Sequence, residues 1–249
     1  MTYKVGIDIG STATKACVLD GENAAFTLVI PTGFSSVEAG RQVLAALADA
    51  GFPQEECRFC ATGYGRVAVP FAEKTVTEIT CHGKGAARLF GPDGVVVDIG
   101  GQDTKAIVLR GGKVVDFRMN DKCSAGTGKF LEIMANRMGL TQDEMSALAR
   151  TGKPTTISSM CTVFAESEVI SLIGQGTPRE DISWGVVESV ASKVSPLVPQ
   201  VAGAAYFLTG GLCENEYLIE RLSAQLGTSV QTCAQARFAG ALGAALSLE

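Results

Sequence analysis

The chain lacks the features that define membrane, secreted and nucleic-acid-binding proteins. Its 249 residues contain no uninterrupted run of 18 apolar residues, and the most apolar stretch, 194–208, includes Pro196, Pro199 and Gln200. That stretch is therefore typical of a buried core rather than of a membrane span. The net charge of −5 gives no reason to expect a basic face for nucleic acid, and the first residues lack the pattern of a signal peptide. We expect a cytoplasmic protein with neither a membrane nor a nucleic acid as its partner.

A phosphate-binding loop of the Walker type is also missing. Gly128-Lys129 is followed by Phe130, and Gly152-Lys153 is followed by Pro154, whereas that loop needs Ser or Thr after its lysine. The segment 63–66, Gly-Tyr-Gly-Arg, is too weak a match to predict a dinucleotide site.

The most informative feature that is present is an internal repeat. Hydrophobic residues make up 46% of the chain and charged residues 19%, which favours a folded protein with a large core. Residues 5–19 recur as residues 95–109, at a constant offset of 90 residues and without a gap. Each copy is an apolar strand that ends in Asp-Ile-Gly, followed by a tight turn and a second strand. Because two copies are too few for a solenoid, the repeat predicts two related lobes that face one another.

Hydrophobic patterns and turn residues predict α/β secondary structure in both halves. Each half is expected to open with a three-stranded antiparallel meander, with third strands at 25–30 and 113–119. Further strands are expected at 58–62, 155–158 and 205–209, and helices at 36–50 (with Ser36 as N-cap), 126–138, 162–173, 184–194, 214–226 and 236–248. The turn residues 91–94 indicate a first lobe of residues 1–92 and a second lobe of residues 93–236, with a C-terminal helix of about 237–249 that packs back on the first lobe.

The two Asp-Ile-Gly turns predict a phosphate site. A glycine directly after a strand lets the backbone approach an anion, and the N–H groups of such a turn can bind phosphate oxygens. An aspartate at the strand end can hold Mg²⁺ through water. Asp8 and Asp98 with their turns therefore favour a clamp for a nucleotide triphosphate, and a third glycine turn, Gly210-Gly211, suits ribose and adenine. One copy alone would be explained as strand-to-turn punctuation, but two copies in fixed register favour a site.

This ordered set of turns resembles the actin, sugar-kinase and heat-shock chaperone ATPase superfamily. The resemblance implies two duplicated ribonuclease H-like lobes with an inter-lobe nucleotide cleft, which is the actin-like ATPase fold. It implies ATP or ADP with Mg²⁺ as ligand, and catalytic roles for Asp8, Asp98 and Gln102. The implied nucleotide contacts are Gly10, Ser11, Thr12, Ala13 and Lys15 in the first turn, Gly100, Gly101, Gln102 and Asp103 in the second, Gly210 and Gly211 in the third, and also Gly126 and Gln235.

The second turn favours hydrolysis over phosphoryl transfer. A sugar kinase of this superfamily needs a carboxylate that takes the proton of the substrate hydroxyl, and Gln102 cannot be that base, although it can orient an attacking water. Asp103 can still be argued as a base. A small-molecule kinase, which would need no iron, is therefore the alternative from another functional class.

The eight cysteines of a cytoplasmic chain do not predict a disulfide framework. The default expectation for each is a buried small hydrophobic residue. Cys123 and Cys161 both precede predicted amphipathic helices, whose N-termini would stabilise thiolates. Cys57 and Cys60 form a C-x-x-C pattern typical of redox or metal sites, but they lie at a strand edge, and we expect both, like the single histidine His82, to be structural.

Two segments, 120–130 and 158–169, together with both Asp-Ile-Gly turns, resemble the activator component of 2-hydroxyacyl-CoA dehydratases and the related ATPase subunits of benzoyl-CoA reductases. The likeness includes 61–66 and 240–245. It implies that Cys123 and Cys161 of both subunits of a homodimer bind one shared [4Fe–4S] cluster, since a cubane needs about four thiolates. It also implies ATP-driven, low-potential single-electron transfer from reduced ferredoxin or flavodoxin to a partner dehydratase or reductase, in an anaerobic host. A partner that carries a double-cubane cluster is a second alternative.

Overall fold

The computed structural model describes residues 2–158 and 161–248 and contains two five-stranded sheets. The strands are β1 (Tyr3–Ile9), β2 (Ala13–Asp20), β3 (Asn23–Pro31), β4 (Cys57–Thr62), β5 (Lys74–Thr75), β6 (Gly94–Ile99), β7 (Thr104–Arg110), β8 (Lys113–Asn120), β9 (Tyr206–Gly210) and β10 (Val230–Gln231). The strand orders are β3-β2-β1-β4-β5 and β8-β7-β6-β9-β10. The two orders correspond strand for strand, so the sequence repeat marks the start of a repeated sheet.

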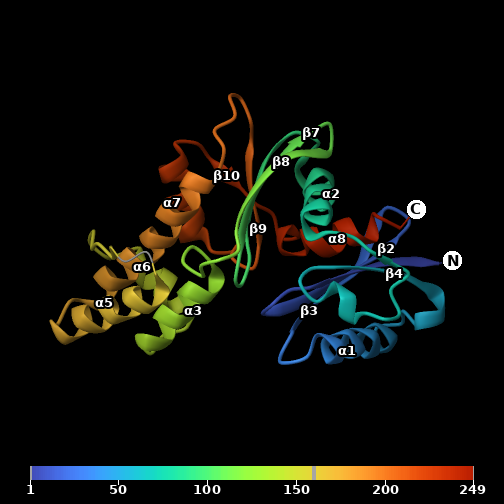
Figure 1. Cartoon of the computed structure of the whole chain (residues 1–249), viewed down its shortest axis with the longest axis horizontal. Coiled ribbons are helices and arrows are strands. Elements are labelled where there is room, and N and C mark those ends of the chain that lie inside the picture. Colours follow the sequence, from blue (N-terminus) through green and yellow to red (C-terminus); the bar gives the residue numbers. More distant parts are fainter. Residues whose placement is uncertain (1, 159–160, 249) are drawn as a thin grey trace. The chain divides into compact units, whose positions relative to one another are not determined.

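Eight α-helices complete the described part of the chain (Figure 1). They are α1 (Ser36–Asp49), α2 (Glu78–Phe90), α3 (Gly128–Arg137), α4 (Gln142–Ala149), α5 (Thr162–Gly174), α6 (Arg179–Val194), α7 (Glu216–Leu226) and α8 (Ala239–Ala245). In residues 2–158 and 161–248, none of these helices has the length and apolar character needed to cross a bilayer.

The chain divides into two compact units, and neither unit is one continuous stretch. The first comprises the described parts of 1–94, 107–117 and 234–249, and the second comprises 95–106 and 118–233. The short segment 107–117 belongs to the first unit because it packs against α2, where Gly83 leaves room for Leu109 and Val114.

One face of the first sheet packs against α1. In the first unit, β1 is antiparallel to β2 and parallel to β4, and β3 is antiparallel to β2. Alternate residues of a strand point to opposite faces, so Val5 and Ile7 lie on the face that packs with Val43 and Leu47 of α1. This hydrophobic cluster fixes the strand that ends at the first Asp-Ile-Gly turn.

The other face of the first sheet is covered by α8, and α2 lies beside α8 (Figure 1). Helix α8 consists only of Ala, Gly and Leu, and this composition lets its backbone come very close to its neighbours. A Cβ at Gly6 would collide with the Ala241 carbonyl, and a Cβ at Gly85 would collide with the carbonyl of Ala239. The small residues of α8 therefore bring the start of α2 close to β1.

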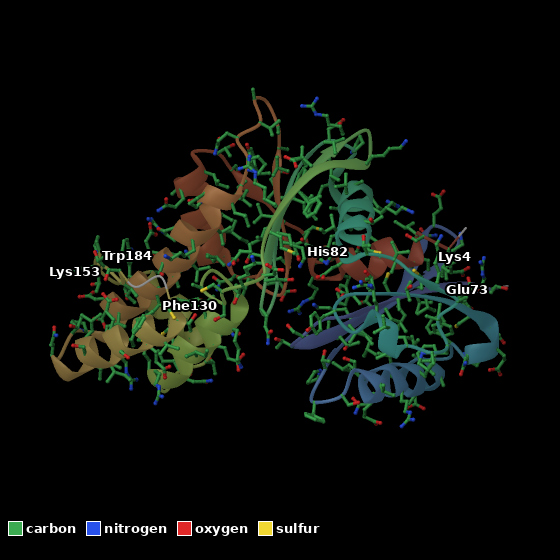
Figure 2. All side chains as sticks on the ribbon, in the orientation of Figure 1. Lys4, Glu73, His82, Phe130, Lys153 and Trp184 are labelled. Atoms are coloured by element: carbon green, nitrogen blue, oxygen red, sulfur yellow. The ribbon has the colours of Figure 1, made fainter. Side chains whose placement is uncertain are left out.

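In the second unit, β6, β9 and β10 are parallel, α7 contacts β10, and helices α3 to α7 belong to the same unit. Helix α3 buries Phe130, Leu131 and Met134 on one face, and Figure 2 labels Phe130 on it. Helix α3 contacts α5, while α6 contacts both α4 and α7. These helices carry the two cysteine segments.

The structure corrects several element limits expected from the sequence. Residues 155–158 are not a strand; this segment lies against α6, where Gly185 leaves room for the Thr155 carbonyl. Helix α6 begins at Arg179 rather than at 184, and the N-cap of α1 is Ser35, whose hydroxyl accepts from the Glu38 amide. The periodicity also did not predict α4, which begins with a capping box between Thr141 and Glu144.

Candidate nucleotide-binding turns and cysteine loop

The first Asp-Ile-Gly turn is tight and is held from the side by Thr32, the residue directly after β3. The Gly10 amide donates to the Ala13 carbonyl over 3.2 Å. Thr32 donates its hydroxyl to the Gly10 carbonyl over 2.7 Å and its amide to the Thr12 carbonyl over 3.0 Å. Ser11 and Thr12 at the turn are exposed. The backbone of this turn is therefore fixed while its outer residues remain accessible to a ligand.

The second turn repeats this geometry. The Gly100 amide donates to the Asp103 carbonyl over 2.9 Å, as Gly10 does to Ala13. A Cβ at Gly100 would lie 2.7 Å from Asp103 Oδ1, so a side chain there would displace the Asp103 carboxylate. Gln102 is exposed at the tip of the turn. Asp103 Oδ1 forms an ion pair with Lys105 Nζ at 2.8 Å. This ion pair occupies the carboxylate that the kinase alternative would need as its base.

Each aspartate faces a glycine with positive φ on the neighbouring parallel strand. Gly63 follows β4 with φ +84°, and Gly210 ends β9 with φ +88°. A Cβ at Gly63 would collide with Asp8 Oδ1 and lie 2.5 Å from the Ile9 carbonyl oxygen. At Gly210 a Cβ would lie 2.7 Å from Asp98 Oδ1 and 2.5 Å from the Ile99 carbonyl oxygen. The third predicted turn thus has a counterpart at Gly63, after β4. The sequence did not single out Gly63 as a turn, although it lies in segment 61–66, which is part of the family likeness.

The two aspartates are both buried but have different neighbours. Asp98 accepts from the Thr209 hydroxyl over 3.0 Å, and its Oδ2 lies 3.5 Å from the buried amine of Lys105. Asp8 Oδ2 lies 3.8 Å from Nε2 of the buried His82, which Figure 2 labels on α2. Thr62 occupies the strand position opposite Asp8 that Thr209 occupies opposite Asp98.

The first predicted cysteine lies in a loop, residues 123–127, that we name the cysteine loop. Asn120 donates its side-chain amide to the carbonyls of Cys123 and Ala125, over 2.9 and 3.3 Å. Thr104 donates to the Gly126 carbonyl over 2.7 Å. Gly126 has φ +87°, and a Cβ there would lie 3.1 Å from Cβ of Lys193. The loop is therefore closely packed, and Cys123 itself is half-buried.

The second predicted cysteine, Cys161, is exposed and is the N-cap of α5. Its carbonyl accepts from the Ala165 amide over 2.9 Å. The free N–H groups at the start of a helix favour negative charge, so this position suits a thiolate. Cys123 does not lie directly before a helix, as the sequence predicted, because α3 begins only at Gly128 and its N-cap is Thr127.

The structure brings the two cysteine segments together. The hydroxyls of Ser124 and Thr162, the residues that directly follow the two cysteines, are 2.8 Å apart. Arg137 of α3 also pairs with Glu166 of α5. Before Cys161, Ser158 donates its amide to the Glu168 carboxylate over 3.1 Å. These contacts hold the start of α5 against the cysteine loop.

The cysteine loop is also attached to the second Asp-Ile-Gly turn. The first two residues of α3, Gly128 and Lys129, donate their amides to the carbonyls of Gly100 and Gly101, both over 2.9 Å. The sequence gives no signal for this attachment, because each donor lies 28 positions after its acceptor along the chain.

Four of the other cysteines, Cys17, Cys57, Cys60 and Cys81, have the environment of structural residues. Burial raises the pKa of Cys17 to about 11 and that of Cys81 to about 12. Burial also raises the pKa of Cys60 and, together with the carboxylates of Glu56 and Glu55, that of Cys57. The C-x-x-C pair is therefore unsuited to thiolate chemistry. Cys60 and Cys81 pack in one apolar cluster with Ala244 and Leu248.

Two predicted nucleotide contacts belong to none of the three glycine turns. Gly126 belongs to the cysteine loop. Gln235 is exposed in the first unit, where it lines a cavity of about 300 Å³ with Arg88 and Phe238 among others. The structure does not test their assignment to a nucleotide, which stays a prediction.

The residues present fit the groups that the sequence resemblance implies. Asp8 Oδ1 is a buried acceptor with no hydrogen-bond partner in residues 2–158 and 161–248, and such an atom is satisfied by water on a bound Mg²⁺. Cys161 offers an accessible sulfur at a helix N-terminus, beside the segment that carries Cys123, which is a suitable donor set for an iron–sulfur group.

The repeated sheets and their paired Asp-Ile-Gly turns define the chain as a protein with the actin-like ATPase fold. Residues 5–247 match the model of the BadF/BadG/BcrA/BcrD ATPase family. The chain belongs to this family, and the fold and family expected from the sequence are confirmed.

Characterised relatives match over nearly the whole chain. The chain is 41% identical to the (R)-2-hydroxyglutaryl-CoA dehydratase activating ATPase of Acidaminococcus fermentans, over 98% of this chain and 96% of the relative. The crystal structure of component A of that dehydratase superposes with a TM-score of 0.93 at 39% identity, covering 99% and 97% of the two chains. The activator of the 2-hydroxyisocaproyl-CoA dehydratase from Clostridium difficile, with bound ADPNP, superposes with a TM-score of 0.91 at 35% identity, covering 99% and 94%.

Proposed function

We propose that this ATPase is the activator of a 2-hydroxyacyl-CoA dehydratase or a related reductase, and that it couples ATP hydrolysis to single-electron transfer. The observation that carries the proposal is the double attachment of the cysteine loop. Ser124 of the loop is hydrogen-bonded to Thr162 at the start of α5, and the two residues that directly follow the loop, Gly128 and Lys129, donate their amides to the second Asp-Ile-Gly turn.

The nucleotide site is proposed to use both turns. The backbone around Gly10 and Gly100 would bind the phosphates, and the ADPNP-bound relative supports a nucleotide as the ligand. Asp8 would hold Mg²⁺ through water with its unpartnered Oδ1. The exposed amide of Gln102 would orient the attacking water. Gly210 and Gly211 would contact the adenosine.

The iron–sulfur site is proposed to use Cys123 and Cys161. A [4Fe–4S] cluster supplies one-electron chemistry at low potential and takes about four thiolates. Two cysteines per chain therefore require a second copy, and a homodimer follows from the ligand count. Cys161 at the start of α5 would be stabilised as a thiolate by the N-terminal amides of the helix.

The coupling between the two sites is proposed to run through α3. Any shift of the Gly100 and Gly101 carbonyls on ATP hydrolysis acts directly on the amides of Gly128 and Lys129. Those residues follow the cysteine loop, so the position of Cys123 depends on the state of the turn. For one electron, roughly 60 mV corresponds to about 1.4 kcal/mol, so a modest difference between nucleotide states is enough to change a reduction potential.

The proposed electron acceptor is a separate dehydratase or reductase, supported by the names of the relatives as activators. The proposed donor is reduced ferredoxin or flavodoxin. No feature of the described residues favours a phosphoryl acceptor, and the pairing of Asp103 with Lys105 weakens the case for a kinase base.

The test is electron transfer under anaerobic conditions to purified (R)-2-hydroxyglutaryl-CoA dehydratase as a representative acceptor. We expect dithionite-reduced wild-type protein to activate the dehydratase only with hydrolysable ATP, and not with ADPNP. Cys161→Ala should lose this activity, while the matched variant Cys233→Ala should keep it. ATP-dependent phosphorylation of a sugar by iron-free protein would instead contradict the proposal and favour the kinase.

A further inference from the structure

Each of the two buried aspartates of the repeat has a basic side chain near its Oδ2. Asp98 Oδ2 is 3.5 Å from Nζ of Lys105, which belongs to the adjacent strand β7. Asp8 Oδ2 is 3.8 Å from Nε2 of His82, which comes from α2. His82 and Lys105 are both almost completely buried, with 3% and 1% of their surfaces exposed. The imidazole thus takes the place at the first aspartate that the amine takes at the second.

Lys15, the repeat counterpart of Lys105, is used differently. It lies opposite Asp8 in the β1–β2 register, but in the described parts of the chain it makes no ion pair with Asp8 and is only half-buried. Its amine lies 3.7 Å from where a Cβ of Gly10 would be. The Lys15 amine is therefore placed over the first turn instead of being held by the aspartate.

The packing around His82 preserves its position. Glu78, one helical turn earlier on α2, has Oε1 3.9 Å from His82 Nε2. On the other side, a Cβ at Gly240 of α8 would lie 2.7 Å from both Asp8 Oδ2 and His82 Nε2. Only glycine at this position leaves the imidazole and the carboxylate facing each other.

The two aspartates also differ in the surroundings of their Oδ1 atoms. Asp98 Oδ1 accepts from the Thr209 hydroxyl over 3.0 Å. Asp8 Oδ1 is buried and has no hydrogen-bond partner within the described residues. An unsatisfied buried carboxylate oxygen is costly, so its orientation must be held by the contacts of the other oxygen until a ligand arrives.

We propose that His82 is a positioning residue for the magnesium nucleotide. It holds Asp8 through Oδ2 so that Oδ1 faces the hydrated Mg²⁺, and it replaces a lysine in this role so that the Lys15 amine is left for the phosphates. The inference rests on the proposed ATP site and adds to it a residue whose sequence context indicated only a structural role.

The test is binding of ADPNP by titration calorimetry, with and without Mg²⁺, to the wild type, His82→Leu and His82→Gln. The contact between His82 Nε2 and Asp8 Oδ2, at 3.8 Å, is an electrostatic one rather than a direct hydrogen bond, and a loss of about 1.4 kcal/mol corresponds to tenfold in affinity. We expect His82→Leu to weaken Mg-ADPNP binding by about this factor and to change Mg-free binding little. His82→Gln, which keeps a donor, should restore most of the affinity. Lys15→Met should weaken binding equally with and without Mg²⁺.

Equal Mg-ADPNP affinity in His82→Leu and the wild type would overturn the inference, whereas a wild type that binds no nucleotide would overturn the proposed function itself. If His82→Leu does not fold, Gly240→Ala decides, because its methyl group intrudes between Asp8 Oδ2 and His82 Nε2. Its matched control is Gly174→Ala, where a Cβ meets nothing within 4 Å. Unchanged Mg-ADPNP affinity in Gly240→Ala would also overturn the inference.

Discussion

The Ser124 hydroxyl lies 2.8 Å from the Thr162 hydroxyl, and these two residues directly follow Cys123 and Cys161. The two cysteine segments of one chain are therefore joined by a hydrogen bond. The 37 residues that lie between the two cysteines in sequence are more than any local turn could span. Because it joins the residues next to both cysteines, this bond supports the proposal that the two thiols bind a common ligand.

Removing this bond should loosen the proposed iron–sulfur site without unfolding the protein. Thr162→Val keeps the shape of the side chain and removes a hydrogen bond worth about 1 kcal/mol. We expect the rate of ATP hydrolysis to be unchanged and the loss of iron to a chelator, measured by absorbance, to be faster. Thr151→Val, which removes a hydroxyl bond to the Leu148 carbonyl at the end of α4, is the control. Equal rates of iron loss in the two variants would contradict the role assigned to the bond.

The glycines that face the two aspartates should be irreplaceable for nucleotide binding. In Gly63→Ala and Gly210→Ala, a methyl group would crowd both an Asp carboxylate and an adjacent carbonyl oxygen, in addition to the strain of positive φ. We expect ADPNP affinity to fall by at least about 100-fold, roughly 3 kcal/mol. Gly139→Ala measures strain alone, because Gly139 has φ +66° and open space around it. A similar small loss in all three variants would show that the crowding does not matter.

The cysteines should differ sharply in their reactivity with iodoacetamide. Only the thiolate reacts, and burial raises the pKa of Cys17 to about 11 and of Cys81 to about 12. At pH 8 these thiols stay protonated, so we expect no alkylation of either in the folded protein. Cys161 is exposed and should be alkylated in iron-free protein but protected in iron-loaded protein, as mass spectrometry of peptides would detect. Protection of Cys161 in the absence of iron would contradict this expectation.

Replacement of Lys105 should lower the free energy of unfolding much more than replacement of Lys15. Lys105→Met leaves the buried Asp98 carboxylate without its amine at 3.5 Å, and breaking a buried pair in this way costs roughly 3–5 kcal/mol. Urea denaturation should show this loss for Lys105→Met and less than about 1 kcal/mol for Lys15→Met. A comparable loss in both variants would mean that Lys15 also has a structural role at Asp8.

The sequence was sufficient to predict the parts of the molecule that depend on short-range signals. The repeat identified both Asp-Ile-Gly turns, and the first meander is confirmed by the antiparallel register of β1, β2 and β3. Residues 155–158 were wrongly expected to be a strand, because their apolar and β-branched residues serve contacts with α6 instead of a ladder. The periodicity of a single segment cannot distinguish these two kinds of burial.

The contacts that define the site depend on distant parts of the chain and left no signal in sequence. The facing of His82 and Asp8 depends on a glycine more than 150 residues further along, at position 240. The attachment of Gly128 and Lys129 to the second turn uses only backbone groups, which any sequence offers. Such contacts follow from the packing of whole helices, and pattern arguments do not reach them.

The central claim is that Cys123 and Cys161 of two chains hold one iron–sulfur cluster. The most direct measurement is the content of iron and acid-labile sulfide, with EPR after dithionite reduction, on anaerobically purified protein of known oligomeric state. The account predicts a dimer with about four irons and four sulfides and the signal of a reduced [4Fe–4S] cluster, all lost in Cys123→Ala and Cys161→Ala. A colourless protein without iron after anaerobic reconstitution would contradict it.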